Sequence, residues 1–155
     1  MIGVRSELAQ AAEIEAAYAR ERARLVRLAY LLSGSRELAE DVVQTVFAEV
    51  HERWFYIDDP PAYLRRAVTN RVRDTQRRQY RRPRSLAVAT VTGDVEIDEM
   101  WARVQQLGPA QRAVVVLHFY EDLSLVEVSR LLGRRPATVR SDLHRALHIL
   151  KRRLE

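Results

Sequence analysis

The sequence contains no cysteine, a single lysine, five glycines and five prolines. Without cysteine the chain has no disulfide framework, no zinc–thiolate site and no thiol nucleophile, which is compatible with a reducing cytoplasm. It also lacks an apolar run of the roughly 18 residues that a membrane span requires. Charged residues interrupt positions 1–24, which excludes the apolar core of a signal peptide. We therefore expect a cytoplasmic protein without membrane insertion.

Basic residues outnumber acidic ones by 26 to 21, which gives a formal charge of +5. Since Lys151 is the one lysine, arginine supplies nearly all of the positive charge. Arginine forms bidentate contacts with phosphates and bases, so the composition favours an anionic partner such as nucleic acid. A membrane surface is a second anionic partner that fits, and a GC-rich genome that prefers arginine codons explains the same bias.

Apolar residues recur at helical spacing in two blocks, and this period is lost between them in residues 83–94. In the first block Ser35 can cap a helix that begins near Arg36, and Pro61 can begin a later one. In the second block residues 113–120 read as a helix, because no other strand is available to pair with them. We predict an all-α fold: two small helical domains, residues 1–82 and 95–155, joined by a linker at residues 83–94.

The second block contains the signals of a helix-turn-helix. Ser124 and Glu127 fit a capping box, Gly133 can adopt a left-handed C-cap, and Pro136 can occupy the first turn of the next helix. We expect two apolar stripes: Ile97, Met100, Trp101, Val104 and Leu107 in the first helix of the block, and Val139, Leu143, Ala146, Leu147 and Leu150 in the last.

The outward face of that last helix is short, polar and basic, and comprises Ala137, Thr138, Arg140, Ser141, His144 and Arg145. Such a helix can enter the major groove of DNA, where side chains near its N-terminus reach base edges. An ordinary helical hairpin with a solvated basic face is the alternative interpretation.

Residues 65–84 contain nine arginines and one acid, Asp74. Contact with a phosphate backbone would relieve the repulsion within such a segment, although a solvated tail is the simpler alternative. Just upstream, Trp54, Phe55, Tyr56 and Tyr63 offer stacking surfaces for unpaired bases. Each of these rings, Trp54 and Phe55 especially, fits a hydrophobic core as well.

The order of these elements resembles the sigma-70 family, specifically its small extracytoplasmic-function (ECF) members, which keep the second and fourth conserved domains. Residues 39–47 look like the polymerase-binding segment (Ala-Glu-Asp-Val-Val-Gln-Thr-Val-Phe). Residues 61–67 with Asn70 look like the segment that melts and reads the minus-ten element (Pro-Ala-Tyr-Leu-Arg-Arg-Ala). Residues 107–114, followed by the capped hairpin, look like the reader of the minus-thirty-five element (Leu-Gly-Pro-Ala-Gln-Arg-Ala-Val).

The resemblance implies a sigma factor that binds core RNA polymerase and promoter DNA and needs no cofactor. It also implies that an anti-sigma factor can bind and inhibit this protein. It implies polymerase contacts at Asp41, Gln44 and Thr45, with Phe47 as core support and with Thr45 where the family commonly has glutamate. It implies contacts to the minus-ten element at Phe55, Tyr56, Tyr63, Arg66, Asn70, Arg73 and Arg77. Contacts to the minus-thirty-five element are expected at Arg135, Thr138, Arg140, Ser141, His144 and Arg145.

Two other hypotheses belong to different classes. An autonomous helix-turn-helix repressor or activator would bind a palindromic duplex as a dimer, without polymerase. A metalloenzyme would have to use His144 and His148, which lie four residues apart on one helix but have no evident third ligand nearby. We therefore expect no metal site and no enzymatic activity.

Overall fold

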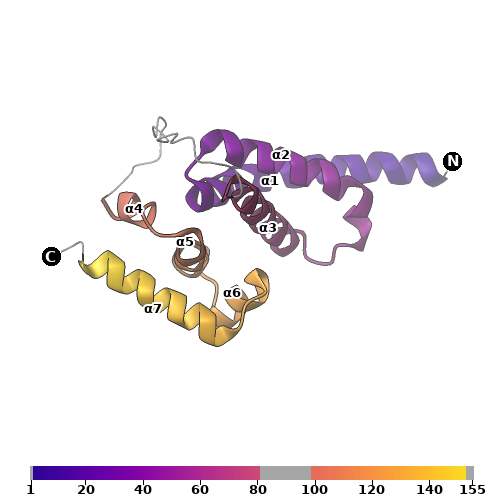
Figure 1. The fold of residues 1–155 in the computed structure, drawn as a ribbon. Helices are drawn as coiled ribbons and strands as arrows, with labels where there is room; N and C mark the ends of the chain where they lie inside the picture. The colour runs from indigo at the N-terminus through magenta and orange to yellow at the C-terminus, as the bar shows by residue number, and fades with distance from the viewer. Residues whose placement is uncertain (1, 81–98, 153–155) are drawn as a thin grey trace. The chain divides into compact units, whose positions relative to one another are not determined.

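The computed structural model describes the backbone of residues 2–80 and 99–152 and the side chains of residues 6–79 and 100–152. All regular elements in these two ranges are helical, which confirms the predicted all-α class (Figure 1). The chain divides into two compact units, residues 1–82 and 83–155. The predicted linker at residues 83–94 lies outside the described residues, as does Ile97. None of the described helices is long and apolar enough to cross a membrane.

The N-terminal unit is built from three long helices and one short one: α1 (Ile2–Ser33), α2 (Arg36–Val50), the 3₁₀ helix η1 (His51–Tyr56) and α3 (Pro60–Tyr80). The helix α1 packs against both α2 and α3, and these two also pack against each other. Apolar side chains from all three helices meet in a common core, in which the following are fully buried: Leu25, Leu28, Val43, Leu64, Val68 and Val72.

Local capping sets the boundaries of these helices. Gly34 has a φ of 74°, in the left-handed region that glycine adopts at little cost, and it ends α1. The hydroxyl of Ser35 accepts the backbone N–H of Leu38 at 3.2 Å, so α2 begins at Arg36 as predicted. The helix α3 begins at Pro60, one residue before the predicted start, because Asp59 accepts the N–H of Ala62 at 3.3 Å and so caps it.

The C-terminal unit contains α4 (Glu99–Val104), α5 (Pro109–Val115), α6 (Leu125–Leu132) and α7 (Pro136–Arg152). The helix α5 continues into a π-helical stretch, η2 (Val116–Tyr120), so the prediction of a helix over residues 113–120 is confirmed. The helix α7 packs against α4, α5 and α6. The core of the unit includes Trp101, Val114, Leu117, Val128, Val139 and Ala146.

Two residues of the predicted apolar stripes are partly exposed, and the prediction that Leu147 faces inward was wrong. Leu147 is 43% exposed and Met100 is 39% exposed. At 3.6 residues per turn, Leu147 lies about 80° around α7 from Val139, at the margin of the buried stripe. The helix α4 has only six residues and makes few contacts with α7, so it does not cover this margin.

Candidate nucleic-acid interface

One face of α2 carries short polar side chains. Asp41, Gln44 and Thr45 are exposed, and their spacing places them on one side of the helix. Within the described residues Asp41 forms no ion pair, whereas Glu40 pairs with Arg36, with 3.5 Å between Oε1 and Nε. The opposite side of α2 is buried and consists of Ala39, Val42, Val43, Val46, Phe47 and Val50. The three predicted polymerase-binding residues thus share one accessible face.

The predicted core role of Phe47 is confirmed. This side chain is 6% exposed, and its ring meets the ring of Tyr18 from α1 edge to face, with 4.9 Å between the centroids. The contact joins the buried side of α2 to α1, while Gln44 lies on the exposed side of the same helix. Packing by Phe47 therefore fixes the orientation of that face.

Five predicted minus-ten residues form a continuous stripe along α3, here called the α3 stripe: Tyr63, Arg66, Asn70, Arg73 and Arg77. Alternating spacings of three and four residues keep them on one side of the helix. Arg66, Arg77 and Tyr63 are exposed, whereas Asn70 and Arg73 are half-buried. The opposite side of α3 is apolar and fully buried, at Leu64, Val68 and Val72.

Ion pairs neutralise part of the charge on α3. Arg71 lies outside the α3 stripe and pairs with Glu49 of α2. Arg77 lies 3.7 Å from Asp74, but both side chains are more than half exposed, so solvent screens this pair. The α3 stripe itself contains three arginines and no acid, and is therefore positively charged. The arginines at positions 81, 82 and 84 of the predicted basic run lie outside the described residues.

The short helix η1 presents two aromatic side chains and buries a third. Phe55 is 58% exposed and Tyr56 is 87% exposed, whereas Trp54 is only 7% exposed. The indole N–H of Trp54 donates to Oε2 of Glu13 on α1 at 3.0 Å. The sequence left both stacking and core roles open for these rings. Trp54 belongs to the core, and the two predicted base contacts, Phe55 and Tyr56, are accessible.

The helix-turn-helix is formed by α6 and α7, and its predicted local signals are confirmed. The hydroxyl of Ser124 accepts the N–H of Glu127 at 3.1 Å, while the Glu127 carboxylate accepts the N–H of Ser124 at 2.7 Å. Gly133 ends α6 with a φ of 63°, and the N–H of Arg134 donates to the carbonyl of Ser129 at 3.0 Å. Pro136 then begins α7.

The predicted outward face of α7 is accessible. Every predicted minus-thirty-five residue is exposed: Arg135, Thr138, Arg140, Ser141, His144 and Arg145. Ala137 lies on the same face and is also exposed. Val139, Ala146 and Leu150 are buried on the other side of the helix, against the unit's core. The structure therefore separates a polar and basic face from an apolar one along the whole of α7.

Arg134 differs from the other basic residues of this region. Its Nη1 lies 2.8 Å from Oδ2 of Asp142, and the two side chains are only 28% and 13% exposed. The pair joins the turn before α7 to the second turn within it. Neither residue is among the DNA contacts that the sequence predicts. No local pattern marks Asp142, because its burial depends on how the turn folds back over α7.

Two further contacts that the sequence did not predict connect α1 to η1. Glu13 accepts the Trp54 indole N–H, and the side-chain amide of Gln10 donates to the carbonyl of His51. In each contact the partners lie 41 positions apart, beyond the reach of any local motif. The one available signal was the need of a buried tryptophan for a hydrogen-bond acceptor.

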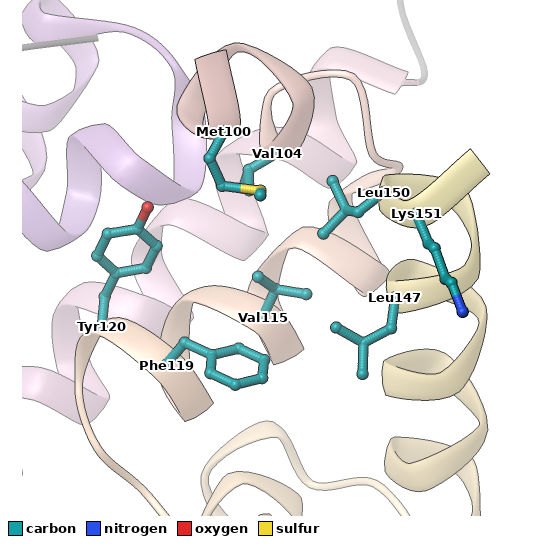
Figure 2. Close-up of a pocket in the computed structure, with 8 residues that line it drawn as sticks. All are labelled: Met100, Val104, Val115, Phe119, Tyr120, Leu147, Leu150 and Lys151. Atoms are coloured by element: carbon teal, nitrogen blue, oxygen red, sulfur yellow. The ribbon is translucent and has the colours of Figure 1, made fainter. Parts of the chain in front are cut away.

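An apolar pocket of about 500 Å³ opens on the C-terminal unit (Figure 2). Phe119 and Tyr120 of η2 line it together with the partly exposed Leu147, and Lys151 is its charged lining residue within the described ranges. The other lining residues are Met100, Val104, Val115 and Leu150. The partly exposed Met100 and Leu147 thus both lie at this pocket.

His144 and His148 are both exposed on α7. Across residues 2–80 and 99–152, no group of three His, Cys, Asp or Glu side chains is placed to hold a metal ion.

Two family models match the two units separately. The model described as Sigma-70 region 2 matches residues 17–82, and the model described as Sigma-70, region 4 matches residues 97–150. The chain is also 33% identical over 132 residues to the RNA polymerase sigma-E factor of Streptomyces antibioticus. This alignment covers 76% of this chain and 71% of that protein. The chain belongs to the sigma-70 family. It is an ECF sigma factor, which directs RNA polymerase to promoters.

One further sequence comparison agrees with this sigma-70 assignment, and one structural comparison shows a similar fold. The chain is 32% identical over 145 residues to the ECF RNA polymerase sigma factor SigE of Mycolicibacterium smegmatis, covering 83% of this chain and 56% of that protein. Its fold is similar to that of the sigma factor RpoE of Bartonella quintana, solved in complex with the anti-sigma factor NepR. That likeness has a TM-score of 0.71 at 19% identity and covers 92% of this chain and 96% of the other.

Proposed function

We propose that this sigma factor works in the cytoplasm and, without catalysing a reaction itself, holds core RNA polymerase on two promoter elements. Residues 1–82 would bind polymerase and the minus-ten element, residues 95–155 the minus-thirty-five element, and residues 83–94 would link them. One observation carries this proposal: each of three helices, α2, α3 and α7, turns a motif-bearing polar face outward and buries an apolar row behind it.

The polymerase contact is assigned to the exposed face of α2. The carboxylate of Asp41 can accept charge-assisted hydrogen bonds from basic side chains of polymerase, while Gln44 and Thr45 add neutral hydrogen bonds beside it. The small side chain of Ala48 is exposed one turn further along the same face, so a partner helix can approach closely. Phe47 supports this face from below.

The minus-ten contact is assigned to η1 and the α3 stripe. Taking a base out of the stack costs a few kcal/mol, and stacking on an aromatic side chain returns about 1–3 kcal/mol per base. Phe55 and Tyr56 are exposed enough to receive such bases. Tyr63, the first residue of the α3 stripe, follows them in the sequence. The arginines of the stripe would then hold the phosphates of the separated strand.

The minus-thirty-five contact is assigned to the exposed face of α7. Thr138, Arg140 and Ser141 lie in the first two turns, the part of a recognition helix that reaches base edges in the major groove. Arg135 and Arg145 flank this segment and are placed to hold phosphates. Arg134 is assigned a structural role instead, since its charge is satisfied by Asp142.

We also infer that an anti-sigma factor binds this chain. The similar RpoE structure was solved with such a partner. In the present chain the apolar pocket leaves Phe119 and Leu147 52% and 43% exposed, which is typical of a surface that another protein covers.

The polymerase contact is tested by run-off transcription with core polymerase on a pool of genomic promoter fragments. We expect protein-dependent transcripts with the wild type and their loss with Asp41→Arg, because the reversed charge repels a basic partner surface. Glu15→Arg on the exposed face of α1 makes the same charge reversal away from α2 and should keep the transcripts. Polymerase-independent binding to a palindromic duplex, without stimulation of any fragment, would instead support an autonomous regulator.

The base-trapping role of η1 predicts that Phe55→Ala and Tyr56→Ala each reduce open-complex formation about 5- to 150-fold, since each removes one stacking surface. Binding to core polymerase should not change. Opening is measured by permanganate reactivity of the minus-ten region on a promoter selected by run-off. Leu8→Ala removes a similarly exposed apolar side chain of the same unit and serves as the control. Equal opening by all three variants would contradict the assignment.

The salt dependence of promoter binding distinguishes Arg145 from Arg134. Arg145→Ala should weaken holoenzyme binding and lower the slope of log affinity against log salt by about 0.9, because it removes one phosphate contact. Arg134→Ala should weaken binding with an unchanged slope, because it disturbs the turn and releases Asp142 but removes no contact to DNA. Fluorescence anisotropy over a salt series measures both. A reduced slope for Arg134→Ala would show that Arg134 binds phosphate.

The anti-sigma proposal is tested by affinity purification of the tagged chain from its own host. We expect polymerase subunits together with one further protein in stoichiometric amount, and loss of that protein alone in the double variant Phe119→Asp/Leu147→Asp. Both side chains are partly exposed, so the substitutions should leave the unit folded, which circular dichroism checks. Recovery of polymerase subunits only, from wild type and variant alike, would count against an anti-sigma partner.

A further inference from the structure

We propose that Glu13 of α1 is a positioning residue for promoter opening, which holds η1 so that Phe55 and Tyr56 face the separated strand. This inference depends on the proposed role of these two aromatic residues. Glu13 precedes the region that the Sigma-70 region 2 model matches, which starts at residue 17. The role is therefore assigned from the contacts of this chain.

The contacts from α1 fix both ends of the first turn of η1. The amide of Gln10 donates to the carbonyl of His51, the first residue of η1, and the Glu13 carboxylate accepts the indole N–H of Trp54 at 3.0 Å. Trp54 is 7% exposed, while Phe55, its immediate neighbour, is 58% exposed. The two contacts therefore hold the backbone of η1, and the backbone sets the direction in which the next two side chains leave it.

The short helix η1 depends on such contacts more than a long helix does. Its six residues form 3₁₀ turns, whose hydrogen-bond geometry is poorer than that of an α-helix. At its end, the N–H of Ile57 donates to the carbonyl of Trp54 at 3.2 Å and closes the last turn. The hydrogen bond from Trp54 to a charged acceptor is stronger than a neutral one and joins this turn to the long, continuous helix α1.

The part of α1 that carries Glu13 is itself anchored in the core. Ile14 is 8% exposed and Ala17 is 1% exposed, and Tyr18 packs on Phe47 of α2. Glu13 is therefore held on a rigid element and does not have to be ordered when DNA binds. Positioning of this kind lowers the entropic cost of DNA binding, because less of the protein has to be ordered when the complex forms.

The negative charge of Glu13 allows positioning and electrostatic repulsion to be told apart, because the two predict opposite effects of removing it. A carboxylate beside a surface that binds DNA repels phosphates, so its removal would strengthen DNA binding if electrostatics were its only effect. Positioning predicts the opposite: without an acceptor the indole can turn, and the two aromatic side chains lose their orientation. Glu15 lies on the same helix, is exposed and carries the same charge, but among the described residues it forms no hydrogen bond or ion pair with η1. Glu15→Ala is thus a matched control for the charge effect.

The experiment compares Glu13→Ala, Glu13→Gln and Glu15→Ala as full chains in reconstituted holoenzyme, by permanganate reactivity of the minus-ten region and by binding to core polymerase. We expect Glu13→Ala to reduce opening about 5- to 30-fold, the effect of losing one hydrogen bond to a buried donor. Glu13→Gln keeps an oxygen acceptor and should restore most of the opening. Glu15→Ala should match the wild type, and all three should bind core polymerase normally.

Combination with the aromatic variants separates the proposed positioning role from the proposed base contact. In a Phe55→Ala/Tyr56→Ala background, Glu13→Ala should cause little further loss, because both side chains that it orients are already absent. If Tyr56→Ala reduces opening but Glu13→Ala behaves like Glu15→Ala, the positioning role is overturned and the proposed function stands. If Tyr56→Ala has no effect, the proposed base contact fails. Loss of core binding by Glu13→Ala and Glu13→Gln alike would make Glu13 a residue of general stability and would also overturn the positioning role.

Discussion

Burial of one apolar row on α3 decides which way the helix faces. Leu64, Val68 and Val72 are fully buried where α3 packs against α1 and α2, so the side chains on the other side must form the surface. The same constraint acts on α2, whose buried valines turn Asp41 outward. The proposed polymerase face and the α3 stripe are thus oriented by one shared core, whereas η1 is also held by polar contacts from α1.

The C-terminal unit combines an apolar core with polar contacts at its helix ends. The helix α6 has only eight residues, too few to be stable alone, so its ends must be fixed. The capping box of Ser124 and Glu127 satisfies its start, and the left-handed Gly133 closes its end. The Arg134–Asp142 pair then ties the following turn to α7. The angle at which α7 would meet DNA is consequently set by polar contacts as much as by apolar packing.

Periodicity and capping signals predicted the helices and most of the exposed face residues, because both depend on neighbours within four positions. What they did not predict was set by distant parts of the chain. Leu147 is exposed because the short α4 leaves it uncovered, and Asp142 is buried because a turn folds over it. Trp54 left two roles open in the sequence, and its acceptor, Glu13, lies 41 positions away. Such contacts follow from tertiary packing, which no local pattern encodes.

The distribution of charge along α3 complements the position of the aromatic residues. Arg71, outside the α3 stripe, is neutralised by Glu49, whereas Arg66 lies on the stripe, which has no acid of its own. In chain order the aromatic residues of η1 come first and the arginines follow. On the proposed assignment, bases would stack at one end of the surface and phosphates would pair along the rest. Salt screens ionic contacts far more than stacking. High salt should therefore weaken phosphate binding by the arginines before it weakens base stacking on the aromatic residues of η1.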